Sequence, residues 1–154
     1  WAVHVALAEA GHPTAGAVAL PGMGLTLSTA EPPTSSALPP IPARPRIVVS
    51  RSRPAIEALA VADALGADLV EMGSAGAKAM AVVRGEADAY VHTGGQHEWD
   101  SCAPVAVALA AGLHATRVDG SPLAYNRADP YLPDLVICRT ELAGRILTTL
   151  ASLA

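Results

Sequence analysis

The only lysine of the chain, Lys78, follows a run of small residues that begins at Gly73 and includes Ser74. Small residues let backbone N–H groups approach an anion closely, and the N-terminus of a helix favours negative charge. The run is not a Walker A loop, because Ala79 stands where that loop has a magnesium-binding Ser or Thr. Ser74 and Lys78 are therefore candidate phosphate ligands, although a plain turn is the commoner meaning of such a run.

A second candidate anion site begins at Ser50, where an expected strand ends and a helix follows. The hydroxyl of Ser50 and the guanidinium of Arg53 suit a phosphate or another oxyanion at a helix start. A serine-capped, solvated helix start is the commoner interpretation of this segment by itself. The two segments together are more informative, because ligands of α/β sheets gather at the carboxyl ends of strands.

A third group of chemistry-bearing residues runs from His92 to Asp100. His92 and His97 could bind a metal, although histidines scattered in a loop are usually just solvated. The pair His97-Glu98 is not a zincin motif, because Ser101 occupies the place of the second histidine. Asp100 opens an expected helix, so it is either an N-cap or, as a carboxylate, a magnesium ligand. One carboxylate does not make a magnesium site, so further ligands must come from elsewhere.

The chain has two cysteines, Cys102 and Cys138, which is too few for a disulfide framework or a four-ligand zinc site. We expect both to be small buried hydrophobic residues, in a reducing, cytoplasmic setting. Ser50 and Ser74 are not expected to be catalytic nucleophiles, since no triad pattern accompanies either of them.

The composition bounds the class of protein. With 154 residues the chain is about one domain, and 51% hydrophobic against 16% charged residues excludes an intrinsically disordered chain. The net charge of −4 leaves no broad basic face for a nucleic acid. The longest uninterrupted apolar run, Ala103–Leu113, is too short to cross a membrane, and the apolar start lacks the basic region of a signal peptide.

Two regions of different character must position these residues. Residues 1–30 contain three short strand patterns, and residues 31–45 form a Pro/Ser-rich loop that can hold neither a helix nor a central strand. Over residues 46–154, short strands alternate with apolar helices, which predicts an α/β layer. The expected strands are 1–8, 15–20, 24–27, 46–50, 68–72, 89–92, 114–118 and 135–138, and the expected helices are 54–65, 75–83, 100–112 and 141–153.

Four stretches of the sequence together resemble the inositol monophosphatase superfamily. They are GSAGAKAM, EADAYVH, EWDSCAPVAVALAAG and DGSPLAYN, and the likeness covers essentially the whole chain. Within that superfamily the chain looks most like the CysQ-type 3'(2'),5'-bisphosphate nucleotidases, particularly the actinobacterial ones. The resemblance implies an αβαβα sandwich, in which residues 1–30 complete the N-terminal antiparallel sheet and residues 46–154 form the C-terminal α/β layers.

The resemblance also implies that the chain is the C-terminal part of such an enzyme. Family members carry an Asp-Pro-Leu-Asp-Gly-Thr metal motif and a Glu-Glu pair before the strand that resembles WAVHVALA, and neither is present here. Of the magnesium ligands, the chain retains Asp100, which matches the aspartate of the family's Trp-Asp pair. We therefore expect residues 1–154 by themselves to be inactive.

Five further residues match positions that contact substrate in the family. Ser50 and Arg53 fall where nucleotidases contact the bound nucleotide, although Arg53 replaces a histidine. Ser74 and Lys78 fall where the phosphate that is not cleaved is held. His92 stands where inositol monophosphatases have Glu, and this change favours a more anionic substrate.

Taken together, the resemblance implies a magnesium-dependent phosphatase that removes the 3'-phosphate of 3'-phosphoadenosine 5'-phosphate, a by-product of sulfate assimilation. Mg²⁺ is the implied cofactor, a small phosphate ester the implied partner, the cytoplasm the implied location and a homodimer the implied assembly. Two alternatives stay open. One is an inositol monophosphatase or fructose-1,6-bisphosphatase activity, and the other is a non-catalytic fragment that binds a nucleotide phosphate.

Overall fold

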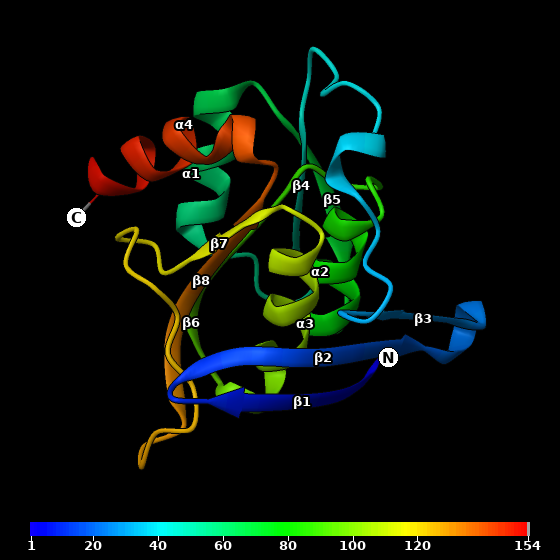
Figure 1. The fold of residues 1–154 in the computed structure, drawn as a ribbon. Helices are drawn as coiled ribbons and strands as arrows, with labels where there is room; N and C mark the ends of the chain where they lie inside the picture. Colours follow the sequence, from blue (N-terminus) through cyan, green and yellow to red (C-terminus); the bar gives the residue numbers. More distant parts are fainter. Residues whose placement is uncertain (154) are drawn as a thin grey trace.

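The computed structural model describes residues 1–153, which form two β-sheets and four α-helices (Figure 1). The first sheet is antiparallel, with the strand order β1-β2-β3. The second sheet has the order β5-β4-β6-β8-β7, in which β4 is parallel to β5 and β6 while β8 is antiparallel to β6 and β7. Residue 154, the last of the expected segment 46–154, lies outside the described residues.

The bounds of the elements are as follows. The strands are β1 (Val3–Glu9), β2 (His12–Leu20), β3 (Leu25–Ser28), β4 (Arg46–Ser50), β5 (Asp68–Met72), β6 (Ala89–His97), β7 (His114–Thr116) and β8 (Tyr131–Cys138). The helices are α1 (Ile56–Leu65), α2 (Ala75–Val83), α3 (Glu98–Ala110) and α4 (Thr140–Ala151), with short 3₁₀ turns at Pro21–Met23 and Ser35–Ala37.

The helices form two layers, one on each face of the five-stranded sheet. α2 and α3 lie between the two sheets, where Val107 of α3 shares one hydrophobic core with Val18 of β2 and Ile137 of β8. α1 and α4 cover the opposite face, where Val61 and Ile146 are fully buried in a second core. This alternation of sheets and helices confirms the predicted α/β layered fold.

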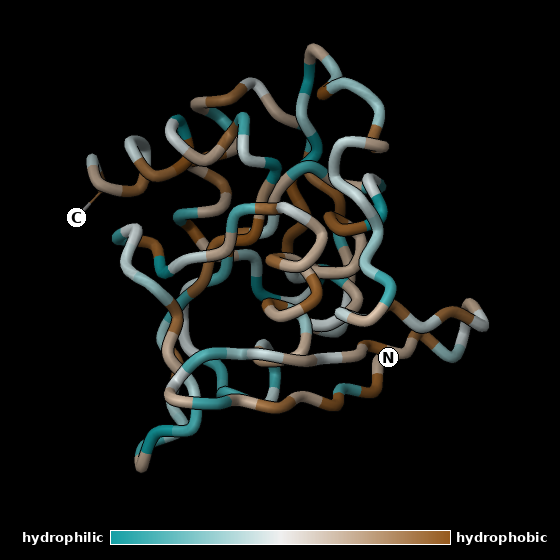
Figure 2. Tube along the Cα trace, viewed as in Figure 1, coloured by the Kyte–Doolittle hydropathy of each residue, from teal (hydrophilic) through white to brown (hydrophobic). Residues whose placement is uncertain are grey.

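β2 packs closely on α3 because Gly16 has no side chain. A Cβ atom at Gly16 would lie 2.9 Å from the Cβ of Ala106 and 3.0 Å from the carbonyl oxygen of Ala103. On β1, by contrast, Val5 and Leu7 are exposed, and apolar positions run along this strand in Figure 2. The three-stranded sheet therefore has one face packed on the helices and apolar residues left uncovered on β1.

The Pro/Ser-rich segment 31–45 is tied to the body of the chain. The backbone N–H of Ser35 donates to the carbonyl oxygen of Ala111 at 2.9 Å. The guanidinium of Arg139 is buried and donates to the carbonyl oxygen of Pro39, also at 2.9 Å. The segment contains neither an α-helix nor a strand, as its prolines predict.

Several element boundaries differ from those expected from the sequence by a few residues, and three of these differences lie beside the candidate residues. β6 continues past His92 to His97, and β8 begins at Tyr131, because the two strands keep pairing through a stretch that the sequence predicts as loop. α3 begins at Glu98, so Asp100 is its third residue. The expected N-cap position of Asp100 is therefore wrong.

Both cysteines are free thiols. Burial raises the pKa of Cys138 to about 12, which fits the expected hydrophobic role, whereas Cys102 is only partly buried. Among the described residues, none of the helices has the length and apolar character needed to cross a membrane.

Candidate functional site

Three parallel strands deliver candidate residues to one edge of the five-stranded sheet. Ser50 of β4 lies opposite Met72 of β5, and Val48 of β4 lies opposite Tyr90 of β6. The carboxyl ends of these strands therefore share one edge, and a helix follows each of them: α1, α2 and α3. Because a helix N-terminus carries partial positive charge, the backbone alone makes this edge attractive to an anion.

A cavity of about 450 Å³ brings together three of the six residues that the family resemblance assigns to the site. Lys78, His92 and Asp100 all line it, although they come from α2, β6 and α3. The cavity falls within the size range of small-molecule sites.

Lys78 contributes a positive charge that no described acidic side chain compensates. The residue is 6% exposed, and its Nζ atom lies 5.0 Å from the centre of the Tyr90 ring, a cation–π contact. Desolvation by burial lowers the pKa of Lys78, because it disfavours the charged form. A bound anion would offset this cost, so Lys78 is suited to hold a phosphate.

Asp100 has one carboxylate oxygen engaged with the backbone and one without a described partner. Its Oδ2 atom accepts a hydrogen bond of 3.0 Å from the N–H of His97 at the start of α3. The remaining oxygen can serve as one ligand of a hard cation such as Mg²⁺. Within residues 1–153, however, no three His, Cys, Asp or Glu residues are grouped so as to hold a metal ion. The described residues thus supply one ligand of a magnesium site, the carboxylate of Asp100.

His92 lines the cavity with one of its ring nitrogens already engaged. Its Nε2 atom lies 3.0 Å from the carbonyl oxygen of Gly95, and since a carbonyl only accepts, Nε2 carries the proton. The neutral ring then offers Nδ1 as an acceptor. A contact from Nδ1 to phosphate therefore requires the doubly protonated imidazolium.

The other three candidates, Ser74, Ser50 and Arg53, do not line the cavity. Ser74 is the N-cap of α2, its hydroxyl accepts from the N–H of Ala77 at 3.4 Å, and the next residue, Ala75, does line the cavity. The hydroxyl of Ser50 accepts from the N–H of Arg53 at 3.3 Å, and Arg53 is exposed. Both hydroxyls act as acceptors in these bonds, so each keeps its proton to donate to a ligand.

Two buried polar side chains of the cavity are absent from the sequence-based set. Gln96 is 8% exposed and Tyr90 is 2% exposed, and neither the amide of Gln96 nor the hydroxyl of Tyr90 has a hydrogen-bond partner among the described residues. Burial, followed by the charge of Asp100, raises the pKa of Tyr90. The sequence does hold one usable signal for Gln96, because two adjacent glycines inside a strand indicate a bulge.

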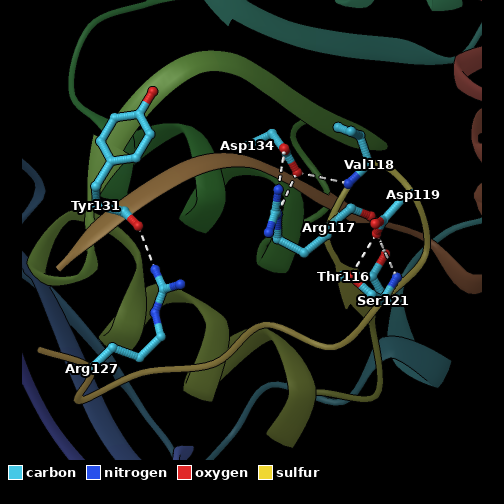
Figure 3. Close-up of polar contacts among 8 residues, drawn as sticks. All are labelled: Thr116, Arg117, Val118, Asp119, Ser121, Arg127, Tyr131 and Asp134. Atoms are coloured by element: carbon cyan, nitrogen blue, oxygen red, sulfur yellow. Dashed lines mark hydrogen bonds and ion pairs between the residues drawn. The ribbon is translucent and has the colours of Figure 1, made fainter. Parts of the chain in front are cut away.

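Tyr131 forms a wall of the cavity, and polar contacts fix the segment that carries it (Figure 3). A Cβ atom at Gly95 would lie 2.6 Å from the Cε2 of Tyr131, so the ring rests directly on the glycine. The guanidinium of Arg127 donates to the backbone carbonyl of Tyr131. Farther along, Arg117 and Asp134 form a two-point ion pair with distances of 2.7 and 2.6 Å. The two arginine contacts therefore tie β8 to the segment that precedes it, and the Tyr131 ring packs β8 against Gly95 of β6.

Comparison with known proteins matches the chain over its described length. The model described as the inositol monophosphatase family covers residues 1–153. The 3'-phosphoadenosine 5'-phosphate phosphatase of Mycobacterium bovis is 51% identical over 157 residues, covering 98% of the chain and 59% of that protein. The 3'(2'),5'-bisphosphate nucleotidase CysQ of Escherichia coli is 31% identical over 145 residues, covering 86% of the chain and 57% of that protein.

Solved structures of this group share the fold of the chain. A CysQ structure from Bacteroides thetaiotaomicron superposes with a TM-score of 0.73 at 23% identity, covering 90% of the chain and 62% of that structure. The chain therefore spans less than two thirds of the length of each of these proteins.

Proposed function

Because the chain belongs to the inositol monophosphatase family, we propose that it supplies the substrate-binding part of a phosphatase that removes the 3'-phosphate of 3'-phosphoadenosine 5'-phosphate. The observation that carries this proposal is the single cavity in which Lys78, His92 and Asp100 meet. The name of the mycobacterial relative supports the same substrate.

In this proposal the two phosphates of the substrate occupy different places. Asp100 marks the end at which the phosphate is cleaved. Lys78 holds the phosphate that is retained, helped by the hydroxyls of Ser74 and Ser50 and by the guanidinium of Arg53. Binding energy from the retained phosphate is then available to orient the scissile one, which explains why a bisphosphate would be preferred over a monophosphate.

The proposed reaction is the hydrolysis of a phosphate monoester. Water attacks the phosphorus atom, and the bond between phosphorus and the ribose 3'-oxygen breaks. The 3'-oxygen takes up a proton that the water gives up and becomes the 3'-hydroxyl of adenosine 5'-phosphate, and the other product is inorganic phosphate. The family is generally metal-dependent, and Mg²⁺, when bound, polarises phosphoryl oxygens and activates water. Asp100 would be one of its ligands, and residues 1–153 hold no group of three His, Cys, Asp or Glu side chains that would complete such a site.

A second candidate function is phosphate binding without catalysis. It is favoured by the isolation of Asp100, since residues 1–153 hold no cluster of metal-ligating side chains. Hydrolysis of an inositol phosphate or of fructose 1,6-bisphosphate is the alternative within the same class. Against inositol phosphate hydrolysis, the buried charge of Lys78 suits a substrate with a second phosphate. Fructose 1,6-bisphosphate also carries two phosphates, so the substrate assay has to distinguish it from the nucleotide.

Three further expectations stay proposals. We propose that residues 1–30, 31–45 and 46–154 are a sheet segment, a connecting loop and an α/β subdomain, that the protein is a homodimer, and that it works in the cytoplasm. The free thiols of Cys102 and Cys138 suit a reducing compartment. Light scattering after gel filtration tests the dimer, because a monomer mass would contradict it.

The proposed function is tested by assaying the full-length gene product with magnesium and three substrates: adenosine 3',5'-bisphosphate, inositol 1-phosphate and fructose 1,6-bisphosphate. Phosphate release fastest from the nucleotide supports the proposal, whereas faster release from either of the others favours the alternative activity. Nucleotide binding without phosphate release from any substrate identifies a binding fragment. The intact mass under denaturing conditions is measured first, because a species near 15.6 kDa predicts the inactive outcome and a larger one predicts turnover.

A further inference from the structure

Gln96 is the polar group of the cavity that the proposed function leaves unexplained. The residue lines the cavity and is 8% exposed, and neither its amide nitrogen nor its amide oxygen has a hydrogen-bond partner among the described residues. Buried polar groups of folded proteins almost always have partners, because an unpaired one costs free energy. An unpaired amide in a cavity wall is therefore a group that a ligand would satisfy.

The backbone around Gln96 is arranged to place this side chain. Between Thr93 and Gln96 the pairing of β6 with β8 shifts register, which marks a bulge. Gly94 and Gly95 have φ angles of +94° and +84°, a region that side-chain-bearing residues rarely adopt. The imidazole of His92 closes the bulge by donating to the carbonyl oxygen of Gly95. Bulges of this kind re-aim a side chain and are frequent beside active sites.

The hydrogen-bonding chemistry of the Gln96 amide limits which ligand groups it can bind. An amide offers N–H donors on one side and a carbonyl acceptor on the other. A phosphate dianion only accepts, so it would leave the oxygen of Gln96 unpaired, and Lys78 already supplies charge and donors. The matching partner must donate and accept at once. An adenine amino edge does so, since glutamine pairs with adenine through two parallel hydrogen bonds, and so does a ribose hydroxyl.

The walls beside Gln96 suit the same part of the substrate. Tyr131 and His97 also line the cavity, and their rings meet edge to face with centroids 6.4 Å apart. Aromatic faces are the common stacking partners of nucleobases. A nucleoside could thus lie against these rings while its polar edge reaches the amide.

We propose that Gln96 is a specificity-determining residue that binds the nucleoside part of the substrate through the paired donor and acceptor of its amide. The inference rests on the proposed function, because it presupposes a nucleotide in this cavity. It assigns recognition of the nucleoside to Gln96, and it leaves recognition of the retained phosphate to Lys78.

The test is the variant Gln96→Leu in the full-length gene product, assayed with four substrates. These are adenosine 3',5'-bisphosphate, inosine 3',5'-bisphosphate, 2'-deoxyadenosine 3',5'-bisphosphate and inositol 1-phosphate. We expect the KM for adenosine bisphosphate to rise about tenfold with kcat nearly unchanged, since two neutral hydrogen bonds are lost from binding. Turnover of inositol 1-phosphate, which has no nucleoside, should stay within about twofold.

The nucleotide analogues distinguish the two sources of the donor–acceptor pair. Inosine carries an oxygen in place of the amino group, so if Gln96 binds the base, the wild-type protein prefers adenosine and Gln96→Leu removes that preference. If Gln96 binds the ribose, the preference that disappears is the one over the deoxynucleotide. Thr148→Val, on the exposed face of α4 and away from the cavity, is the control and should leave both preferences intact.

Two outcomes would overturn the inference, and they differ. Equal losses on all four substrates in a folded Gln96→Leu variant would make Gln96 a structural residue while the proposed function stands. A wild-type protein that neither binds nor hydrolyses any bisphosphate nucleotide would remove the proposed function and the inference together. Should Gln96→Leu fail to fold, Gln96→Met, which keeps an unbranched side chain, carries the same expectations.

Discussion

The ammonium of Lys78 lies 5.0 Å from the centre of the Tyr90 ring, and no carboxylate of the described residues forms an ion pair with it. The face of the ring offsets part of the cost of burying the charge. Desolvation nevertheless lowers the pKa of Lys78, which means that keeping Lys78 charged costs free energy in the folded protein. Burial of Lys78 is therefore better explained by ligand binding than by stability.

The variant Lys78→Met tests whether the buried charge of Lys78 destabilises the folded protein. In the folded chain the pKa of Lys78 is lowered from its ordinary value of 10.5. At a pH between the lowered pKa and 10.5, Lys78 is protonated in the unfolded chain but not in the folded one, so the free energy of unfolding rises with pH. Lys78→Met removes this slope and should raise the free energy of unfolding at neutral pH by roughly 1 kcal/mol. Urea unfolding at pH 7 and pH 10 measures both changes.

The same position controls substrate choice in the proposed function. Lys78→Ala should reduce hydrolysis of adenosine 3',5'-bisphosphate much more than hydrolysis of inositol 1-phosphate, because only the former has a retained phosphate. Arg145→Met, which removes an exposed cation of α4, is the control and should change neither. Equal losses on both substrates in Lys78→Ala would contradict the role of Lys78 in choosing the nucleotide.

A hydrogen bond between Thr93 and Glu57 joins β6 to the start of α1 at the same edge of the sheet. The hydroxyl of Thr93 donates to the carboxylate at 2.5 Å, and this bond is the main reason that the pKa of Glu57 is lowered. The stabilisation is present above the ordinary pKa of Glu57, 4.5, and is lost as the pH falls through the lowered value. Thr93→Val should therefore cost about 0.5 kcal/mol at pH 7 and nothing at pH 2.

Thermal unfolding at the two pH values checks this expectation. Thr148→Val, on the exposed face of α4, is the matched control, since it makes the same change without a carboxylate partner. A Thr93→Val deficit that persists unchanged at pH 2 would show that the bond to Glu57 is not its source.

The buried carboxylate of Asp88 should be the most sensitive electrostatic position of the sheet. Asp88 is fully buried and accepts from the backbone N–H and the Nε of Arg46 at 2.8 and 3.0 Å, which fixes the start of β4 beside the start of β6. Asp88→Asn should lower the free energy of unfolding by about 2–4 kcal/mol, because it leaves a guanidinium unpaired at a partly buried place. Asp68→Asn, which disrupts an exposed pair with Arg44, should have no measurable effect. Urea denaturation measures both variants, and equal stabilities would contradict the role of burial.

The sequence predicts the strand–helix alternation well where local signals and packing agree. β4, β5 and α2 have the expected bounds, because β-branched strands and a small-residue turn before Lys78 point to the same elements as the tertiary pairing does. Lys78 and Asp100 can also be identified from the sequence. One is a lone lysine after a glycine turn, and the other is an acidic residue before an apolar run.

Gln96 shows what sequence patterns do not contain. Its neighbours Gly94 and Gly95 favour a loop by propensity, but pairing with β8 keeps them in β6 and turns them into a bulge. Whether an amide is buried and unpaired depends on the walls around it, which here include Tyr131, far along the chain. The sequence also predicts that the helix starts at Asp100, whereas α3 begins at Glu98, directly after the end of β6 at His97.

Asp100→Asn tests the metal-binding role of the one cavity carboxylate. An amide oxygen can still accept from the N–H of His97, which Asp100 does at 3.0 Å, so the start of α3 and the fold should be preserved. An amide carries no negative charge and is a weak ligand for Mg²⁺. Magnesium-dependent turnover of adenosine 3',5'-bisphosphate by the full-length gene product should therefore fall about a hundredfold or more, and half-saturation should need more magnesium. Asp63→Asn, on the exposed surface of α1, should behave as wild type. Near-normal turnover in Asp100→Asn at an unchanged magnesium requirement would mean that Asp100 serves only to cap α3.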